Sequence, residues 1–307
     1  EVNTVSLAEL WALFWPALLA SLLAAMLSGL LGFFVVARRV AFMSAALGQL
    51  SGLAVASGFL LGSYFGVDPH GETPLYLNPV MLALVVSGAV AALLAYVPKV
   101  QRTTPESTIA FVYLAAAALA LIVLASPRIV QEAHEVGDLL FGNTVAVRSE
   151  HLIELAVVAA IVSGSVVLLF KDLVFISFDR EMARTLGLPV FWLDLWLHLC
   201  IGLSVAAATR AIGALPVFGF LVLPAGAALL VTESMWRIVA LSIVGAVVAA
   251  ALGFYLSFVS GMPDPTLPPD EAQALWALPT GPTMVVCAAA YWPLAAAVRA
   301  VSQRNRA

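Results

Sequence analysis

Charged residues are scarce in this sequence, at 10% of its 307 residues, whereas hydrophobic residues make up 63%. Histidine occurs four times and cysteine twice. So low a charge content leaves no segment from which an independent soluble catalytic domain could be built. Apolar runs long enough to cross a bilayer recur from one end of the chain to the other. The sequence therefore predicts an all-α polytopic membrane protein with a single transmembrane domain over residues 1–307.

Several catalytic patterns are also missing. Neither Lys99 nor Lys171 follows a glycine, so the phosphate-binding pattern G-x-x-x-x-G-K-[ST] does not occur. The patterns H-E-x-x-H and G-x-S-x-G are absent too, which argues against an intramembrane enzyme. Cys200 and Cys287 lie inside apolar runs and are expected to be small core residues rather than a disulfide or a zinc site. We expect a chain that is not an enzyme and binds no cofactor of its own, and no nucleic-acid partner is expected.

The hydrophobic runs predict about nine transmembrane helices. The first run lacks a basic segment and a small-residue cleavage site before it, so it is expected to remain as a span. The predicted spans cover residues 12–36, 41–61, 79–97, 108–125, 152–170, 190–208, 212–231, 238–259 and 283–298.

Basic residues choose the orientation of these spans. With the N-terminus outside and the C-terminus in the cytosol, eleven of the 14 lysines and arginines lie inside, and the other three are Arg128, Arg148 and Arg210. The opposite orientation would reverse this bias, so the positive-inside rule favours the first. The residues placed inside are Arg38, Arg39, Lys99, Arg102, Lys171, Arg180, Arg184, Arg237, Arg299, Arg304 and Arg306.

The predicted outer loops are acidic, and one of them carries a dense cluster of possible metal ligands. His134, Glu135 and Asp138 would lie three and four residues apart on a helix, a spacing that can hold a divalent cation or meet a binding protein. A solvated loop is the alternative. For the acidic face as a whole, the alternatives are a solvated rim and a surface that concentrates cations or docks a basic partner.

A short amphipathic segment, residues 178–187, separates the fifth and sixth predicted spans. Asp179 is placed to cap a short helix and Gly187 to stop it. Phe178, Met182 and Leu186 recur every four residues and form an apolar stripe beside Arg180 and Arg184. The segment is either an interfacial connector or a coupling helix that a cytosolic ATPase grips, with these contact candidates: Phe178, Asp179, Arg180, Glu181, Met182, Ala183, Arg184 and Gly187.

Polar and small residues within the spans are candidates for a substrate path. Asp194 and His198 share one face of the sixth span, as a transport pair or as a satisfied structural pair. Ser44, Gly48, Gly52 and Ala56 form a small-residue stripe on the second span, which close helix packing alone would explain.

Gln49 lies beside that stripe and is a candidate pore-lining group. Pro216 and Pro224 are expected to interrupt the seventh span, either as a broken helix near a gate or as a simple kink.

Four stretches together resemble the permease subunits of metal-type ABC importers, a family that moves zinc, manganese or iron. They are residues 31–39 with 41–42, residues 139–143, residues 179–187, and residues 212–217 with 223–225. The resemblance implies a homodimeric permease in the bacterial cytoplasmic (inner) membrane. It also implies two cytosolic ATPase subunits, which bind ATP and Mg, and usually an extracytoplasmic substrate-binding protein.

The chain departs from this family at several positions. Ala45, Gln49 and Ala116 stand where members commonly have Asp, His and His, and Asn143, a further path candidate, stands where Asp is frequent. Because metal coordination needs imidazole or carboxylate donors, the metal carried is left open. A permease for a siderophore or cobalamin is one alternative. An ATP-independent secondary transporter is another, although only Asp194 and His198 lie well within a span and no repeat is visible.

Overall fold

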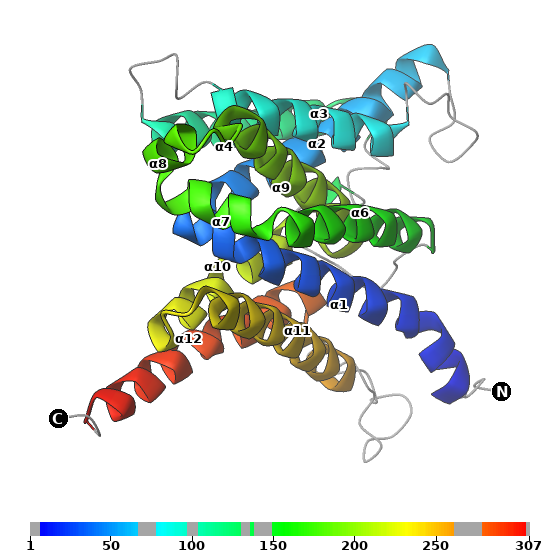
Figure 1. The fold of residues 1–307 in the computed structure, drawn as a ribbon. Coiled ribbons are helices and arrows are strands. Elements are labelled where there is room, and N and C mark those ends of the chain that lie inside the picture. The colour runs from blue at the N-terminus through cyan, green and yellow to red at the C-terminus, as the bar shows by residue number, and fades with distance from the viewer. Residues whose placement is uncertain are drawn as a thin grey trace.

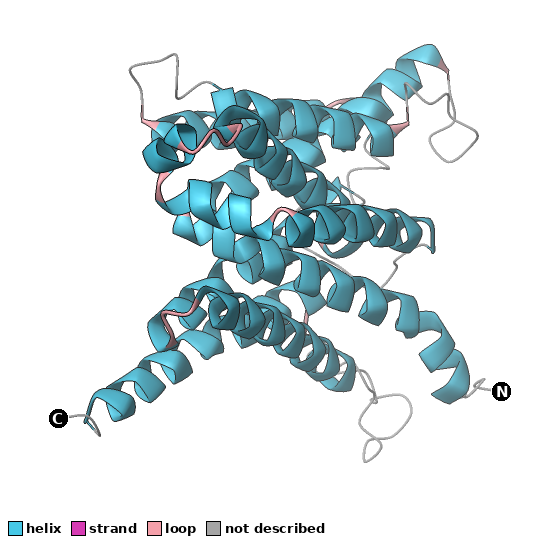
Figure 2. Ribbon diagram, in the orientation of Figure 1, coloured by secondary structure: helices cyan, strands magenta, loops and turns pink. Residues whose placement is uncertain are grey.

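The computed structural model describes residues 7–66, 78–96, 104–129, 136–137, 149–260 and 278–304. Within these ranges the chain consists of helices joined by turns and contains no strand (Figure 2). The helices are α1 (Leu7–Ala37), α2 (Ala41–Phe65), α3 (Pro79–Tyr96), α4 (Pro105–Leu124), the 3-10 helix η2 (Pro127–Ile129), α6 (Ser149–Leu168), α7 (Phe170–Phe178), α8 (Arg180–Thr185), α9 (Val190–Ile212), α10 (Ala214–Val231), α11 (Met235–Ser260) and α12 (Thr280–Arg304).

Nine of the described helices are long and apolar enough to cross a membrane, as the sequence predicts. They are α1, α2, α3, α4, α6, α9, α10, α11 and α12. The predicted short helix between the fifth and sixth spans is also confirmed, as α8. The chain is therefore an all-α polytopic membrane protein.

Helix α1 runs through the middle of the bundle. It packs against α6 and α9 on one side and against α10 and α11 on the other, while α2 packs against α3 and α4 (Figure 1). The contact of α1 with α10 is close, because a Cβ atom added at Gly32 would overlap the carbonyl oxygen of Leu221. Small residues allow backbones to approach in this way in membrane helices, where van der Waals packing drives association.

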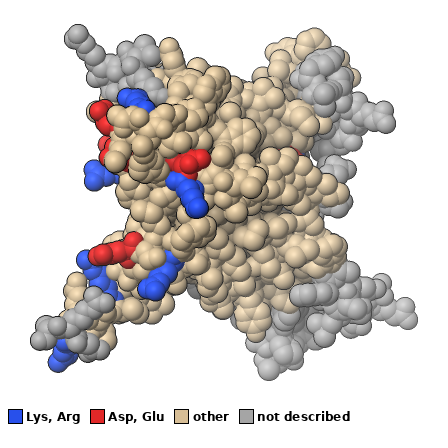
Figure 3. Space-filling model, viewed as in Figure 1, with Lys and Arg blue, Asp and Glu red and all other residues tan. Residues whose placement is uncertain are grey.

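The two ends of the bundle differ. Helix α8 and the last turn of α12 lie at one end, and the first turn of α1 lies at the other (Figure 1). On the face shown in Figure 3, the coloured lysine, arginine, aspartate and glutamate side chains gather at the end that carries α8 and α12. Which side of the membrane this end faces stays a prediction from the positive-inside rule.

The connection between α9 and α10 corrects two of the predictions. Residues 209–211, expected in an outer loop, are helical, and only Gly213 separates the two helices. Gly213 has φ of +90°, a conformation open to glycine, so the chain reverses in a single residue. Pro216 does not interrupt α10 but lies in its first turn, where a helix needs no N–H donor. Pro224 does lie inside this helix.

Helix α7 is not among the predicted elements, because it falls largely between the predicted fifth span and the amphipathic segment 178–187. Phe170, Leu173 and Ile176 are its buried residues, and their spacing of three is the pattern of a helix with one apolar face. Leu169 separates α6 from α7 with φ of −95° and ψ of 9°. The fifth span therefore ends at Leu168 rather than Phe170.

Candidate functional site

The short helix α8 begins at a sharp break in the chain. Asp179 has an extended conformation, with φ of −138° and ψ of 92°, and ends α7 one residue before α8 begins. Its carboxylate accepts a hydrogen bond from the backbone N–H of Met182 at 2.8 Å. Asp179 is thus the N-cap of α8 and satisfies a backbone donor that a helix start leaves free.

Helix α8 also ends in a defined motif. The N–H of Gly187 donates to the carbonyl oxygen of Arg184, and the N–H of Leu188 donates to that of Ala183, both at 3.0 Å. Gly187 has φ of +79°. This is the Schellman arrangement, in which a left-handed residue lets the chain return to the last turn of the helix. Both ends of α8 are therefore fixed by hydrogen bonds within the segment.

The apolar side chains of this segment point outward. Phe178, Met182 and Leu186 are 60%, 54% and 64% exposed, and Ala183 is fully buried. The predicted single stripe on one helix is wrong in one respect, because the break at Asp179 puts Phe178 at the end of α7. All three side chains are nevertheless more than half exposed, and those of Glu181 and Arg184 are exposed as well.

A buried carboxylate connects α8 to the spans. One oxygen of Asp194, on α9, receives hydrogen bonds from Arg180 of α8, at 3.1 Å, and from Arg38 in the turn between α1 and α2. Arg38 also donates through Nε to the hydroxyl of Ser177, in the last turn of α7, at 2.9 Å. Burial lowers the pKa of Arg38, and the charge of Asp194 opposes this shift. The Arg180 of the predicted charged ridge is thus held by an acidic partner.

His198 lies one turn after Asp194 on the same face of α9, as its spacing predicts. Its Nδ1 atom is 2.8 Å from the backbone oxygen of Asp194 and 3.9 Å from the carboxylate. Both side chains are buried. The pair is engaged in contacts at the end of the bundle that carries α8.

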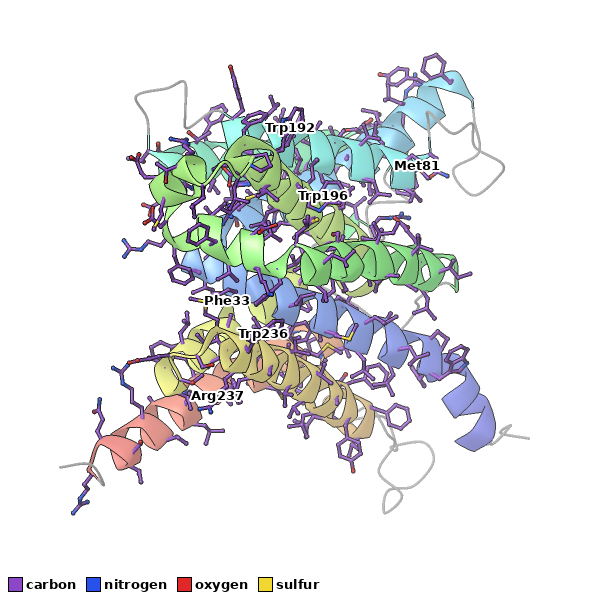
Figure 4. The ribbon with its side chains drawn as sticks, in the orientation of Figure 1. Phe33, Met81, Trp192, Trp196, Trp236 and Arg237 are labelled. Carbon is purple, nitrogen blue, oxygen red and sulfur yellow. The ribbon has the colours of Figure 1, made fainter. Side chains whose placement is uncertain are left out.

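Aromatic rings form a second connection at this end of the bundle. Phe170 of α7 stacks on Trp236 of α11, with ring centroids 4.1 Å apart, and also contacts Phe34 of α1. Phe33 touches both Phe34 and Phe178. Figure 4 shows Phe33 and Trp236 at the boundary between α7 and α11. Through Phe170, α7 therefore contacts both α1 and α11.

The path candidates on α2 meet the junction of α9 and α10. A Cβ atom added at Gly48 would lie 3.0 Å from Ala214 and 3.8 Å from the hydroxyl oxygen of Thr209. Ser44, Gly48 and Gly52 are buried, and the Ser44 hydroxyl donates to the carbonyl of Ala41. At Gly48 this stripe therefore lies in close contact with the start of α10.

Other path candidates differ in exposure. Gln49 is half-buried, whereas Pro216 and Pro224 are buried in α10. The hydroxyl of Thr209 is buried without a hydrogen-bond partner in the described part of the chain.

The predicted metal ligands His134, Glu135 and Asp138, and the path candidate Asn143, lie outside the described residues. Within the described ranges, no group of three or more His, Cys, Asp or Glu side chains is arranged to hold a metal ion. Ala116, at a position where the family often has histidine, is buried in α4.

A polar cluster that was not predicted joins α6 to α9. Arg210 donates to the carboxylate of Glu154 at 2.7 Å and contacts Nδ1 of His151 at 3.2 Å. His151 and Glu154 are three residues apart on α6, a spacing that could have indicated a shared face. Their partner could not be found in this way, because Arg210 was assigned to a loop.

Known proteins share both the sequence and the fold. A sequence profile of the ABC 3 transport family matches residues 11–267. The manganese transport system membrane protein MntC of Listeria monocytogenes is 28% identical over 244 residues, which are 79% of this chain and 81% of that protein. A probable iron transport system membrane protein of Haemophilus influenzae is 24% identical over 243 residues, 79% of this chain and 83% of that protein.

Two solved structures share the architecture. PsaBC from Streptococcus pneumoniae, in complex with Fab, superposes with a TM-score of 0.72 at 21% identity, over 94% of this chain and 95% of that chain. An inward-facing putative metal-chelate type ABC transporter gives a TM-score of 0.68 at 15% identity, over 96% and 90% of the two chains. The profile match, which covers most of the sequence, and these two folds agree: the chain belongs to the ABC 3 transport family.

Proposed function

We propose that this chain is the permease subunit of an ATP-driven importer in the bacterial inner membrane, with α8 as its contact to a separate ATPase. The observation that carries this proposal is the construction of α8. The helix is capped at both ends, yet Met182 and Leu186 beside it are 54% and 64% exposed. Exposed apolar side chains on a rigid helix are suited to a groove in a protein partner.

The assembly around this subunit follows from the family. Two copies of the chain would form the path, two cytosolic ATPase subunits would bind ATP and Mg, and an extracytoplasmic binding protein would deliver substrate. Closure of the ATPase pair would displace α8 together with α7 and α9, so that the path opens to one side at a time.

The proposed substrate is a divalent metal ion, manganese or iron first and zinc next. The names of the relatives from Listeria and Haemophilus support this choice. A metal chelate is the second candidate. It is favoured by Ala45, Gln49 and Ala116, which bring no imidazole or carboxylate to α2 and α4, and by the likeness in fold to a putative metal-chelate type transporter.

Reconstitution with the cognate ATPase and binding protein tests the proposal. Met182→Glu should insert normally but lose about tenfold or more of its ATPase binding, since central apolar contacts dominate interfaces. Glu181→Arg should likewise reduce substrate-stimulated ATP hydrolysis. Lys171→Gln, an exposed change on α7, serves as the control.

Uptake of radioactive manganese, iron and zinc, with a ferric chelate beside them, identifies the substrate. Normal ATPase binding and normal uptake in both α8 variants would refute the coupling role. Uptake that continues without ATP would instead support a secondary transporter.

A further inference from the structure

Helix α8 has little apolar contact of its own with the bundle. It is six residues long, and Ala183 is its one buried residue. A helix of this length is not stable by itself, so its position depends on its caps and on side chains that reach the spans. Arg180 is such a side chain, because it extends from α8 to Asp194 on α9.

The carboxylate that Arg180 reaches is almost fully buried. The side chains of Asp194 and Arg38 are 2% and 5% exposed, whereas that of Arg180 is 45% exposed. A buried charge that loses its partner strongly destabilises the fold, so Arg38 and Asp194 are expected to stay paired. Arg180 is the exposed member of the three residues. Nη2 of Arg38 is also buried and has no hydrogen-bond partner among the described residues, which makes this arginine depend on Asp194 and Ser177.

The same geometry argues against Asp194 as a cation ligand in the path. Two guanidinium groups lie on one of its oxygens, and their positive charges would repel a metal ion at that position. Its contacts lead instead to the α1–α2 turn, to α8 and, through Arg38, to the end of α7.

We infer that Asp194 is a positioning residue for energy coupling. By holding Arg180 and Arg38 on one carboxylate oxygen, it makes α8, the start of α9 and the α1–α2 turn move as one body. This inference rests on the proposed function of α8 and adds to it the link through which an ATPase movement enters the spans. Without the link, α8 would still meet the ATPase, but its displacement would be only partly passed to α1 and α9.

The test uses the complete transporter in proteoliposomes and compares Arg180→Gln, Asp194→Asn and the double variant. The measured quantities are ATPase co-purification, the rate of ATP hydrolysis, and the substrate transported per ATP hydrolysed. Arg180→Gln should keep the ATPase bound and lower transport per ATP about tenfold, the effect of one charge-assisted hydrogen bond. Asp194→Asn should lower it at least as much, because its carboxylate accepts from two arginines. The double variant should lose no more than Asp194→Asn alone, because Asp194→Asn already removes the ion pair with Arg180. Arg180→Lys should restore part of the loss.

Arg180→Gln leaves the buried Arg38–Asp194 pair intact. If Asp194→Asn fails to fold, transport per ATP can therefore still be measured in Arg180→Gln. Arg39→Gln is the matched control, since Arg39 is exposed in the same turn as Arg38. Wild-type transport per ATP in Arg180→Gln would overturn the inference. So would a raised KM for substrate with normal coupling, or loss of ATPase binding in Arg180→Gln alone. A wild-type complex that binds no ATPase would instead contradict the proposed function itself.

Discussion

A guanidinium nitrogen of Arg210 lies 2.7 Å from a carboxylate oxygen of Glu154, joining the last turn of α9 to the beginning of α6. Both side chains are largely buried. Removing one partner of such a pair leaves an uncompensated charge, so Arg210→Met should lower the free energy of unfolding by about 3 kcal/mol. Glu154→Met combined with Arg210→Met should recover much of this loss. Unfolding in detergent, followed by tryptophan fluorescence, measures both effects.

The control for this prediction is Glu106→Gln, which changes an exposed acid in the first turn of α4. It should unfold as the wild type does. Wild-type stability of Arg210→Met would show that the pair contributes nothing to the fold.

Position 187 needs glycine for its backbone conformation, although there is room for a side chain. A Cβ atom there would meet nothing within 4 Å, but φ is +79°. Gly187→Val should therefore cost about 1–2 kcal/mol in the left-handed conformation and release the end of α8, whereas Gly187→Asn should be tolerated better. ATP hydrolysis stimulated by substrate is the measurement, and equal activity of the two variants would count against a role for the cap.

Position 32 needs glycine because there is no room for a side chain, and not for its backbone conformation. A methyl group there would overlap the backbone of α10 at Leu221, so Gly32→Ala should destabilise the bundle by about 1–3 kcal/mol or more. Gly164→Ala is the matched comparison, because a Cβ atom at this helical glycine meets nothing within 4 Å. The temperature of unfolding in detergent should fall for the first variant only, and equal shifts would contradict the close contact.

The N-cap of α8 gives a fourth prediction. Asp179→Ala removes the acceptor for the N–H of Met182 and should destabilise the start of α8 by about 1 kcal/mol. Asp179→Asn keeps an acceptor oxygen and should stay near the wild type. Hydrogen exchange at Met182 reports the opening of this turn directly, and unchanged exchange in Asp179→Ala would refute the prediction.

The spans could be predicted because the length of an apolar run is a local property that the bilayer sets. The caps of α8 are local as well, so Asp179 and Gly187 could be read from their positions alone. Helix α7 was not predicted because Phe170 was assigned to the preceding span. The three-residue spacing of Phe170, Leu173 and Ile176 therefore did not stand out as the pattern of a separate helix.

The contacts of Asp194 could not be predicted in the same way. Arg38 lies 156 residues before it in the chain, and no periodicity connects the two. The sequence shows that an acid deep in a span needs a partner, but only the packing of α1 against α9 decides which arginine supplies it. The turn at Gly213 could not be predicted either. The apolar pattern of this region is compatible both with a loop of three residues and with a turn at a single glycine.

Because Gly213 alone separates α9 from α10, a movement of α9 is passed directly to α10. Helix α9 has 23 residues and, at 1.5 Å each, is a rod of about 35 Å. No loop separates the far end of α9 from α10, so no flexible segment lies between them to absorb a rotation of α9. A tilt of about 5° at the end that carries Asp194 would move the opposite end by about 3 Å, as the length of the rod requires. The displacement would arrive where Gly48 packs against Ala214, so a small rotation at one end of the bundle becomes a change of helix spacing within it.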